Sequence, residues 1–335
     1  GLLASAGSDG NVTLFDFAAA RELTVFHGHQ RQLTCLAFSH HGRHLASAGD
    51  DMTVRLWDAD AAARPQADLR HGTKVQSVRF LPDSKHFITA GEDRALNPPV
   101  SVIKLWDLAT SNVQATATAT GLPIHNSIAL SPDAGLLAVN QILTPGGNQA
   151  NQLRFLAVGS LTSVTNLPGA HPAFSNPDSV LVYSQGTKLL RRASLTEPPA
   201  EIGQTADPIQ VVAVSPDGRT AVTRSGDGTG ALEFWDVSAT NPPVTWDEHD
   251  GDVQGLAFSP DGRFLASAAW DRTVGLWEVS SRRLLKRLRG HRGAVHCVAF
   301  SPDSHPPPRQ GTCPPIARTH RRPCRSVALG IAQSH

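Results

Sequence analysis

Cysteine, methionine and tyrosine are scarce in this sequence: its 335 residues include 4 Cys, 1 Met and 1 Tyr, and aromatic residues make up 6%. So few cysteines cannot build a disulfide framework, which favours a reducing compartment, and we expect the cytoplasm. No apolar run approaches the roughly 18 residues that a membrane-spanning helix needs. The N-terminus lacks the charged and apolar zones of a secretory signal. We therefore expect no membrane partner.

An excess of charge of one sign is also missing. The 30 Lys and Arg residues balance 29 Asp and Glu residues, for a formal net charge of +1. Electrostatic attraction to nucleic acid or to an acidic membrane is therefore weak, and no nucleic-acid partner is expected. Glycine (28) and proline (24) are plentiful by comparison. Frequent turns of this kind are typical of many short strands, which predicts an all-β fold.

The sequence contains an internal repeat. The segment LAFSHHG at residues 36–42 recurs as VRFLPDS, IALSPDA, AFSNPDS, VAVSPDG, LAFSPDG and VAFSPDS, at intervals of 40 to 50 residues. Its anchor positions are Ser39, Leu81, Ser131, Ser175, Ser215, Ser259 and Ser301. After most anchors comes a second strand, a tight turn and a third strand that ends in LWD, FWD or LWE. Such a period predicts a stack of antiparallel meanders that share a core.

These motifs resemble the WD40 family of β-propellers over residues 1–303. Gly-His pairs open two repeats, and Trp-Asp pairs close three of them, at Gly28-His29, Gly290-His291, Trp57-Asp58, Trp106-Asp107 and Trp235-Asp236. The resemblance implies a seven-bladed propeller. The repeats at residues 122–205 depart from the pattern and are expected to be the weak part of the fold. Their departures are Gly121 in place of His, Val139 in place of Ser or Thr, and Leu156 after Phe155 in place of Asp.

One blade is expected to be split between the two ends of the chain. Residues 1–28 match the second, third and fourth strands of a repeat, whereas residues 291–303 hold the missing first strand. Pairing them would close the ring and remove two exposed strand edges. Residues 304–335 are rich in Pro and Arg and are predicted to be a disordered tail, which we hypothesise to arise from a shifted reading frame near Ser304.

A set of four residues recurs at fixed spacing in the well-formed repeats. In the WD40 family these positions form a buried hydrogen-bonded chain that links an indole, a hydroxyl, an imidazole and a carboxylate. The matching residues here are His29, Ser47, Asp51 and Trp57; His71, Thr89, Asp93 and Trp106; His249, Ser267, Asp271 and Trp277; and His291, Ser5, Asp9 and Phe15. The fifth unit keeps Thr223, Asp227 and Trp235 but has Thr205 in place of His. A catalytic triad would also use Ser, His and Asp, but its repetition around the ring favours a structural role.

The resemblance also marks positions for partner contacts. In WD40 proteins the residue before the turn Asp, and the residues that flank the first apolar position of the inner strand, face the top of the ring. The matching turn positions are Ser8, Asp50, Glu92 and Trp270, and the matching strand positions are Gln32, Thr34, Lys74, Gln76, Asp252, Gln254 and His296. Trp270 occupies a turn where other repeats carry small or acidic residues, and tryptophan is enriched in the energetic centres of interfaces.

The expected function is that of a non-catalytic, monomeric scaffold that binds partner proteins on its top face, without metal or cofactor. Two alternatives remain open. The first residue is Gly and not Met, so the ring could be the C-terminal sensor half of a larger signalling protein, fused to a kinase, nucleotide-binding or helix-turn-helix domain. The second alternative is a propeller hydrolase, although no surplus carboxylate cluster is apparent.

Overall fold

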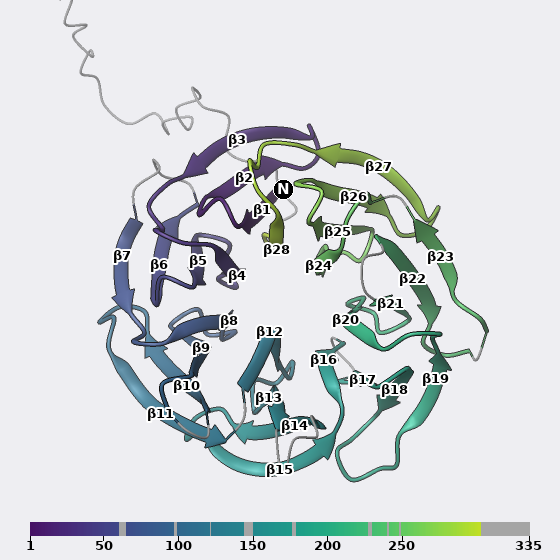
Figure 1. Ribbon diagram of the computed structural model, residues 1–335, viewed down its shortest axis with the longest axis horizontal. Helices are drawn as coiled ribbons and strands as arrows, with labels where there is room; N and C mark the ends of the chain where they lie inside the picture. The colour runs from purple at the N-terminus through teal and green to yellow at the C-terminus, as the bar shows by residue number, and fades with distance from the viewer. Residues whose placement is uncertain are drawn as a thin grey trace, which may run out of the picture.

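The computed structural model describes residues 1–59, 65–96, 99–120, 122–143, 150–175, 179–226, 230–239, 241–247 and 249–302. The strands in this part of the chain form seven four-stranded antiparallel sheets, arranged radially around a central channel (Figure 1). The expected all-β, seven-bladed propeller is confirmed. The predicted disorder and frame shift of residues 304–335 lie outside the described residues.

Each blade is a meander whose first strand lies at the channel and whose fourth lies at the rim (Figure 1). The split blade consists of β28 (Val295–Phe300), β1 (Leu2–Gly7), β2 (Val12–Asp16) and β3 (Arg21–Phe26). Next come β4 (Leu33–Phe38), β5 (His44–Gly49), β6 (Thr53–Asp58) and β7 (Pro65–Arg70), then β8 (Lys74–Phe80), β9 (His86–Asp93), β10 (Val100–Asp107) and β11 (Val113–Thr120).

The remaining four blades continue around the ring. They are β12 (Leu122–Leu130), β13 (Leu136–Leu143), β14 (Ala150–Ala157) and β15 (Thr162–Pro168); β16 (Ala170–Phe174), β17 (Leu181–Gln185), β18 (Lys188–Arg192) and β19 (Ala200–Gln204); β20 (Ile209–Val214), β21 (Thr220–Ser225), β22 (Ala231–Asp236) and β23 (Val244–Asp247); and β24 (Val253–Phe258), β25 (Phe264–Ala269), β26 (Val274–Glu278) and β27 (Arg283–Leu288). The degenerate repeats therefore form complete sheets.

The repeated SPDG segment makes the turn between the first two strands of a blade. Ser259 Oγ donates to Asp261 Oδ1 at 2.6 Å and accepts the Phe264 backbone N–H at 2.9 Å. Gly262 follows with φ of +69°, a left-handed conformation that glycine adopts without steric cost. The short polar side chains thus satisfy the turn, so the anchor serine lies buried beneath each such hairpin.

The ring closes through the split blade, as expected from the sequence. Strand β28 pairs antiparallel with β1, with Leu3 opposite Phe300 and Gly7 opposite Val295. The Leu2 backbone N–H also donates to Ser301 Oγ at 3.0 Å. In Figure 1, β28 lies at the channel and the N-terminus lies behind it in the same blade. Closure joins the two ends of the described chain in one sheet.

The core is a ring of apolar clusters between neighbouring blades. Leu3 and Phe15 of the split blade, for example, pack in one cluster with Leu276 of β26. Burial of apolar surface between blades, at roughly 25 cal/mol per Å², is therefore the main stabilisation that each blade receives from its neighbours. Within the described part of the chain, no helix is long and apolar enough to span a bilayer.

Strand register corrects one assignment in the degenerate blade β12–β15. Trp57 lies opposite Leu45 in the blade β4–β7, and the matching partner of Leu137 is Leu156, not Phe155. Leu156 therefore takes the place of the indole and not that of the following Asp. Val139 occupies the hydroxyl position as expected, and both side chains are fully buried. Gly121 lies outside the described residues.

Candidate functional site

The blade β4–β7 contains the complete four-residue network. The Trp57 Nε1–H donates to Ser47 Oγ at 2.8 Å, and Ser47 Oγ lies 2.8 Å from His29 Nε2. His29 Nδ1 lies 2.7 Å from Asp51 Oδ2. Because the serine accepts the indole proton, its own hydroxyl donates to Nε2, and Nδ1–H donates to the carboxylate. The network ties the loop before β4 to β5, to the following turn and to β6.

Two further blades repeat this geometry. His249 lies 2.7 Å from both Ser267 Oγ and Asp271 Oδ2, and Trp277 Nε1 donates to Ser267 at 2.8 Å. In the split blade, His291 from one end of the described chain meets two residues from the other, at 2.7 Å to Ser5 and 2.9 Å to Asp9. Phe15 is buried at the indole position and provides no donor. That network is one bond shorter.

Hydrogen bonds set the ionisation of these groups. Burial alone would raise the pKa of Asp51, but hydrogen bonds from His29 and Thr53 outweigh it and hold that pKa well below its usual value. The pKa of Asp271 is lowered in the same way, against burial, by Thr273 and His249. Burial lowers the pKa of His249 despite the neighbouring Asp271. A neutral imidazole between a hydroxyl and a carboxylate fits this pattern.

The buried position of the hydroxyls decides what these networks can do chemically. Ser5, Ser47 and Ser267 each have 0% exposure. A nucleophilic serine must reach a substrate carbonyl, whereas these oxygens are enclosed and already bonded to an imidazole. The geometry is that of a polar clamp which holds a loop and a turn against the sheet.

The blade β8–β11 departs from the expected network. Trp106 Nε1 donates to Thr89 Oγ1 at 2.9 Å, but His71 Nδ1 pairs with Thr73 at 2.8 Å, and His71 Nε2 has no partner. The expected link from His71 to Asp93 does not form. Strands β9 and β10 are each eight residues long, so Asp93 belongs to the end of a strand and accepts the Ala95 N–H at 3.0 Å.

The expected structural role of Asp93 is therefore wrong, because the extra residues lengthen the hairpin and carry the carboxylate away from the imidazole. Without a carboxylate partner, burial and the nearby Lys104 lower the pKa of His71 to about 3.

Two other blades build different polar pairs at the same positions. In β20–β23, Trp235 Nε1 donates to Thr223 Oγ1 at 2.8 Å, and Thr223 donates to Glu233 Oε2 at 2.8 Å. Glu233 thus accepts the bond that an imidazole takes elsewhere, while Asp227 lies outside the described residues. In β16–β19, Arg192 occupies the indole position and donates from Nε to the hydroxyl of Tyr183 at 3.2 Å.

The structure gathers five of the residues expected to contact partners around one hollow of about 290 Å³. It is lined by Gln32, Thr34, Gln254, Trp270 and His296, which come from three blades. The Trp270 backbone N–H donates to the Asp252 carbonyl at 2.9 Å, while its side chain is 53% exposed. Thr34 lines this hollow from strand β4, at a position the sequence had marked for partner contacts.

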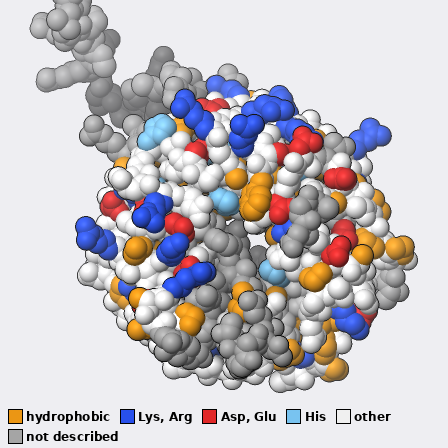
Figure 2. Space-filling model, viewed as in Figure 1, with side chains coloured by type: hydrophobic (Ala, Val, Ile, Leu, Met, Phe, Trp, Pro, Cys, Tyr) orange, Lys and Arg blue, Asp and Glu red, His pale blue; other side chains and the backbone are white. Residues whose placement is uncertain are grey.

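Polar pairs hold several of the remaining candidate residues. Asp50 Oδ2 accepts from Lys74 Nζ and from Gln32 Nε2, each at 3.1 Å, and so bridges the neighbouring blades β4–β7 and β8–β11. Asp252 lies 3.7 Å from the guanidinium of Arg224. Figure 2 shows acidic, basic and hydrophobic side chains interspersed around the central opening of one face.

Three expected contact residues are almost fully buried, and Thr34, at 1% exposure, is the deepest of them. Glu92 is 5% exposed and accepts a hydrogen bond from Arg94 at 3.0 Å. Gln76 is 4% exposed. Both Glu92 and Gln76 belong to the blade β8–β11. The candidate surface is therefore reduced to Ser8, Gln32, Asp50, Lys74, Asp252, Gln254, Trp270 and His296.

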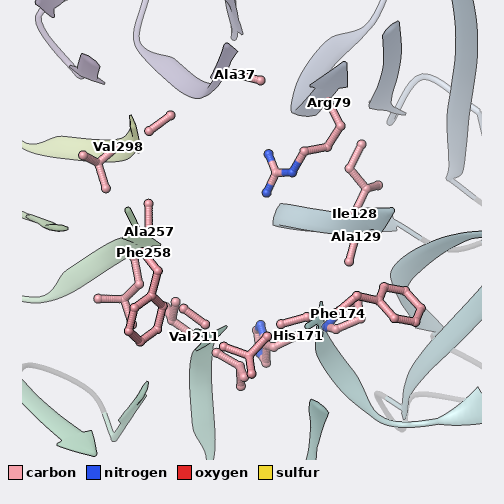
Figure 3. A pocket seen from close by; sticks show the side chains of 18 of the residues that line it. Ala37, Arg79, Ile128, Ala129, His171, Phe174, Val211, Ala257, Phe258 and Val298 are labelled. Carbon is pink, nitrogen blue, oxygen red and sulfur yellow. The ribbon is translucent and has the colours of Figure 1, made fainter. Parts of the chain in front are cut away.

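The central channel carries basic side chains that the repeat motifs did not indicate. Arg79, His171 and Arg224 line a central cavity of about 580 Å³ (Figure 3). The signal in the sequence was the arginine of VRFL, where the other six repeats have alanine before the last apolar residue. Among the described residues, no cluster of three or more His, Cys, Asp or Glu side chains is placed to hold a metal ion.

Comparisons with known proteins agree with this geometry. The family described as "WD domain, G-beta repeat" matches residues 20–58, 64–97, 240–278 and 282–305. A "U3 snoRNP-associated protein-like YAOH" from Oryza sativa subsp. japonica is 46% identical over 39 residues, which are 12% of this chain and 8% of that protein. A "U5 small nuclear ribonucleoprotein 40 kDa protein" from Pongo abelii is 46% identical over 39 residues, 12% of this chain and 11% of that protein.

Each similarity to a curated relative is about one repeat long. The matched segment spans only about a tenth of the length of those relatives, so it concerns the repeat and not the whole of either protein. The matched repeats, the seven sheets and the recurring His–Ser–Asp–Trp networks agree with one another. The chain belongs to the WD40 repeat family of β-propellers.

Proposed function

We propose that this propeller is a non-catalytic scaffold which binds partner proteins on the face that carries Trp270. The observation that supports the proposal best is the half-exposed indole of Trp270, which lines a hollow shared by three blades. A rigid ring with a concave, multi-blade surface suits this role because the contact residues are held in place before a partner binds.

Trp270 has no evident role in the fold. Trp57 and Trp277 are each 1% exposed and donate to a buried serine, whereas Trp270 is 53% exposed. The equivalent turn positions carry Ser8 and Asp50, so the turn itself does not require a large side chain. A large apolar group left at the surface, with polar side chains around it, is typical of an interface anchor.

The buried state of the repeated hydroxyls supports the absence of a catalytic role. Ser47 and Ser267 are enclosed in structural networks, and we propose no cofactor and no metal for this chain. A balanced formal charge of +1 supports protein partners in preference to nucleic acid or membrane. The curated relatives are named for ribonucleoprotein particles, but the matched segment is one repeat and carries no such role to this chain.

We also propose that the propeller acts as a monomer in the cytoplasm. An alternative is that it forms the C-terminal sensor half of a larger signalling protein. Mapping the start codon of the gene distinguishes these two: an upstream coding segment for a kinase, nucleotide-binding or helix-turn-helix domain supports the fused form, and a start immediately before Gly1 supports the free-standing ring.

Substitution of Trp270 tests the binding face directly. Trp270→Ala should weaken the affinity for a partner by roughly 30-fold, the equivalent of about 2 kcal/mol, because the indole is the largest exposed group of the hollow. Leu285→Ala is the matched control, since Leu285 is 49% exposed in the outer strand of the same blade. Affinity would be measured by titration of a partner identified by crosslinking to the wild-type protein.

The expected result separates the two faces of one blade. Trp270→Ala loses affinity while Leu285→Ala keeps it, and both variants melt as the wild type does. A folded Trp270→Ala variant with wild-type affinity contradicts the proposed face. A loss caused equally by Leu285→Ala would place the interface on the outer rim.

A further inference from the structure

The innermost strands place one residue of each blade in a common ring around the channel. The position lies one residue before the last apolar residue of each inner strand. Its occupants are Ala37, Arg79, Ala129, Ala173, Ala213, Ala257 and Ala299, and all seven line the central cavity. Six blades therefore present a methyl group at this level, and one blade presents a guanidinium.

Strand register shows that the seven positions are equivalent. Ala37 lies opposite Ala46 in β5, and Arg79 lies opposite Ile88 in β9, each one step from a Phe–Leu or Phe–Phe pair that ends the ladder. Ala257 lies opposite Ala266 in the same way. The arginine is therefore a substitution within a conserved geometric position of the ring, and not a product of a shifted strand.

The guanidinium of Arg79 lies in the channel without an acidic neighbour. In Figure 3 it projects from the wall into the central space, with Val298 and Ala257 across the channel. Its Nη1 donates a hydrogen bond to the carbonyl of Val78 in its own strand, at 2.8 Å. Among the described residues that line the cavity there is no Asp or Glu. Burial lowers the pKa of Arg79, so the surroundings disfavour its charge.

The fold itself does not need this charge. Six blades close the same ring with alanine at the same register. Arg79 is half-buried, and a cation partly shielded from water without a paired carboxylate costs the folded protein free energy. Since the other blades show that a methyl group suffices, the arginine is explained by something that enters the channel and complements it. Guanidinium groups complement carboxylates and phosphates by parallel hydrogen bonds.

The rest of the wall indicates what accompanies the anionic group. Arg224, the second arginine of the cavity, is already engaged, since it donates to the Gly226 carbonyl at 2.6 Å and lies 3.7 Å from Asp252. His171 also faces the channel, where burial and Arg224 lower its pKa to about 4, so its ring is neutral near pH 7. Apart from these and two glutamines, the lining is apolar or glycine, as in Val211, Phe258 and Val298.

We propose that the central channel binds a small organic anion, with its carboxylate or phosphate on Arg79 and its hydrocarbon part against the apolar wall. A volume of about 580 Å³ is in the range of small-molecule sites. The site lies in the channel, and Gln254 lines both it and the hollow around Trp270. The ring thus binds a small molecule in its channel as well as a partner protein on its face.

Paired probes that differ only in charge test this site. Hexanoate, hexyl phosphate and the neutral hexanol would be titrated into the full-length protein by isothermal calorimetry. Hexanoate and hexyl phosphate should bind at least about 10-fold more tightly than hexanol, because only they can pair with a guanidinium. Inorganic phosphate, which lacks the hydrocarbon part, should bind at least about 10-fold more weakly than hexyl phosphate.

Variants at the ring position assign the binding to Arg79. Arg79→Ala restores the residue of the other six blades and should abolish the preference for hexanoate over hexanol without lowering the melting temperature. Arg79→Met, which keeps the length of the side chain without its charge, should do the same and serves if the alanine variant does not fold. Arg31→Ala is the matched control, since Arg31 is an exposed arginine, and it should bind as the wild type does.

Two results would overturn the proposal. One is anion binding of wild-type strength by a folded Arg79→Ala or Arg79→Met variant. The other is a wild-type protein that binds neither anionic probe more tightly than hexanol at millimolar concentration. Stronger or equal binding of inorganic phosphate compared with hexyl phosphate would remove the hydrocarbon part from the proposal, and the site as stated would be wrong.

Discussion

Two blades of the ring fill equivalent interior positions with different kinds of side chain. In the blade β4–β7, four polar groups from His29 to Trp57 form a bonded chain. In the blade β12–β15, the hydroxyl and indole positions carry Val139 and Leu156, and both are fully buried. Each region nevertheless forms a complete four-stranded sheet.

The difference shows that the network is one way to fill the blade and is not a condition of its formation. When all partners of a buried hydrogen-bonded set are replaced by apolar groups, no donor or acceptor is left unpaired, and the change can be nearly neutral. Partial replacement is the costly case. The blade β16–β19 avoids that cost, since Tyr183 and Arg192 replace the hydroxyl and the indole together and bond to each other.

The largest expected effect comes from opening the split blade, which no other blade resembles. A chain that ends at Arg292 lacks β28, so β1 loses its partner from Leu3 to Gly7, and the apolar cluster that includes Val298 and Phe300 is exposed. We expect loss of the cooperative unfolding transition, measured by circular dichroism during heating. A chain that ends at Pro302 keeps every described strand and is the control; equal behaviour of the two chains would contradict closure by β28.

An intermediate effect is expected from breaking one complete network. His249→Ala leaves the hydroxyl of Ser267 and the carboxylate of Asp271 buried without their partner, and should destabilise the fold by roughly 1–3 kcal/mol. Denaturant unfolding measures the loss. Val139→Thr sharpens the comparison, because it places a hydroxyl of similar volume in a blade without histidine or indole and should also destabilise, by about 1–2 kcal/mol. A His249→Ala variant of unchanged stability would show that the network contributes nothing.

The smallest expected effect is a pH dependence caused by the incomplete network. His71 has a pKa of about 3 in the folded chain, below its ordinary value of 6.5, because of burial and Lys104. As the pH falls through 6.5, the imidazole of His71 therefore becomes protonated in the unfolded chain but stays neutral in the folded chain. The stability that neutral His71 allows is fully present above that pH and is lost as the pH falls toward 3.

Between about pH 7.5 and pH 5, His71 should account for a loss of roughly 1–2 kcal/mol. The measurement is denaturant unfolding at both pH values for the wild type and for His71→Gln, which cannot titrate. The variant should show a smaller pH dependence than the wild type. An identical dependence in both proteins would mean that another group is responsible.

Most of the fold could be predicted from the sequence because turn residues mark where the strands of each repeat end. The period of 40 to 50 residues, the SPDG turns and the displaced first strand at residues 294–303 were sufficient to predict seven blades and their closure. The spacing of His29, Ser47, Asp51 and Trp57 was informative because the intervening strands have standard lengths. The same reasoning failed at Asp93, where a longer hairpin breaks the relation between spacing and distance.

The sequence by itself determined which segments form strands and in which order they join the ring, since turn residues and alternating apolar residues are local properties. Only the tertiary structure decided which side chains from different blades meet. It placed Trp270 beside Gln32 and His296 and buried Glu92. It also let Glu233 accept the hydroxyl hydrogen bond that a histidine accepts in other blades, and it set Arg79 alone in a ring of alanines. Those relations depend on the packing of strands far apart in the chain, which the spacing within one repeat does not specify.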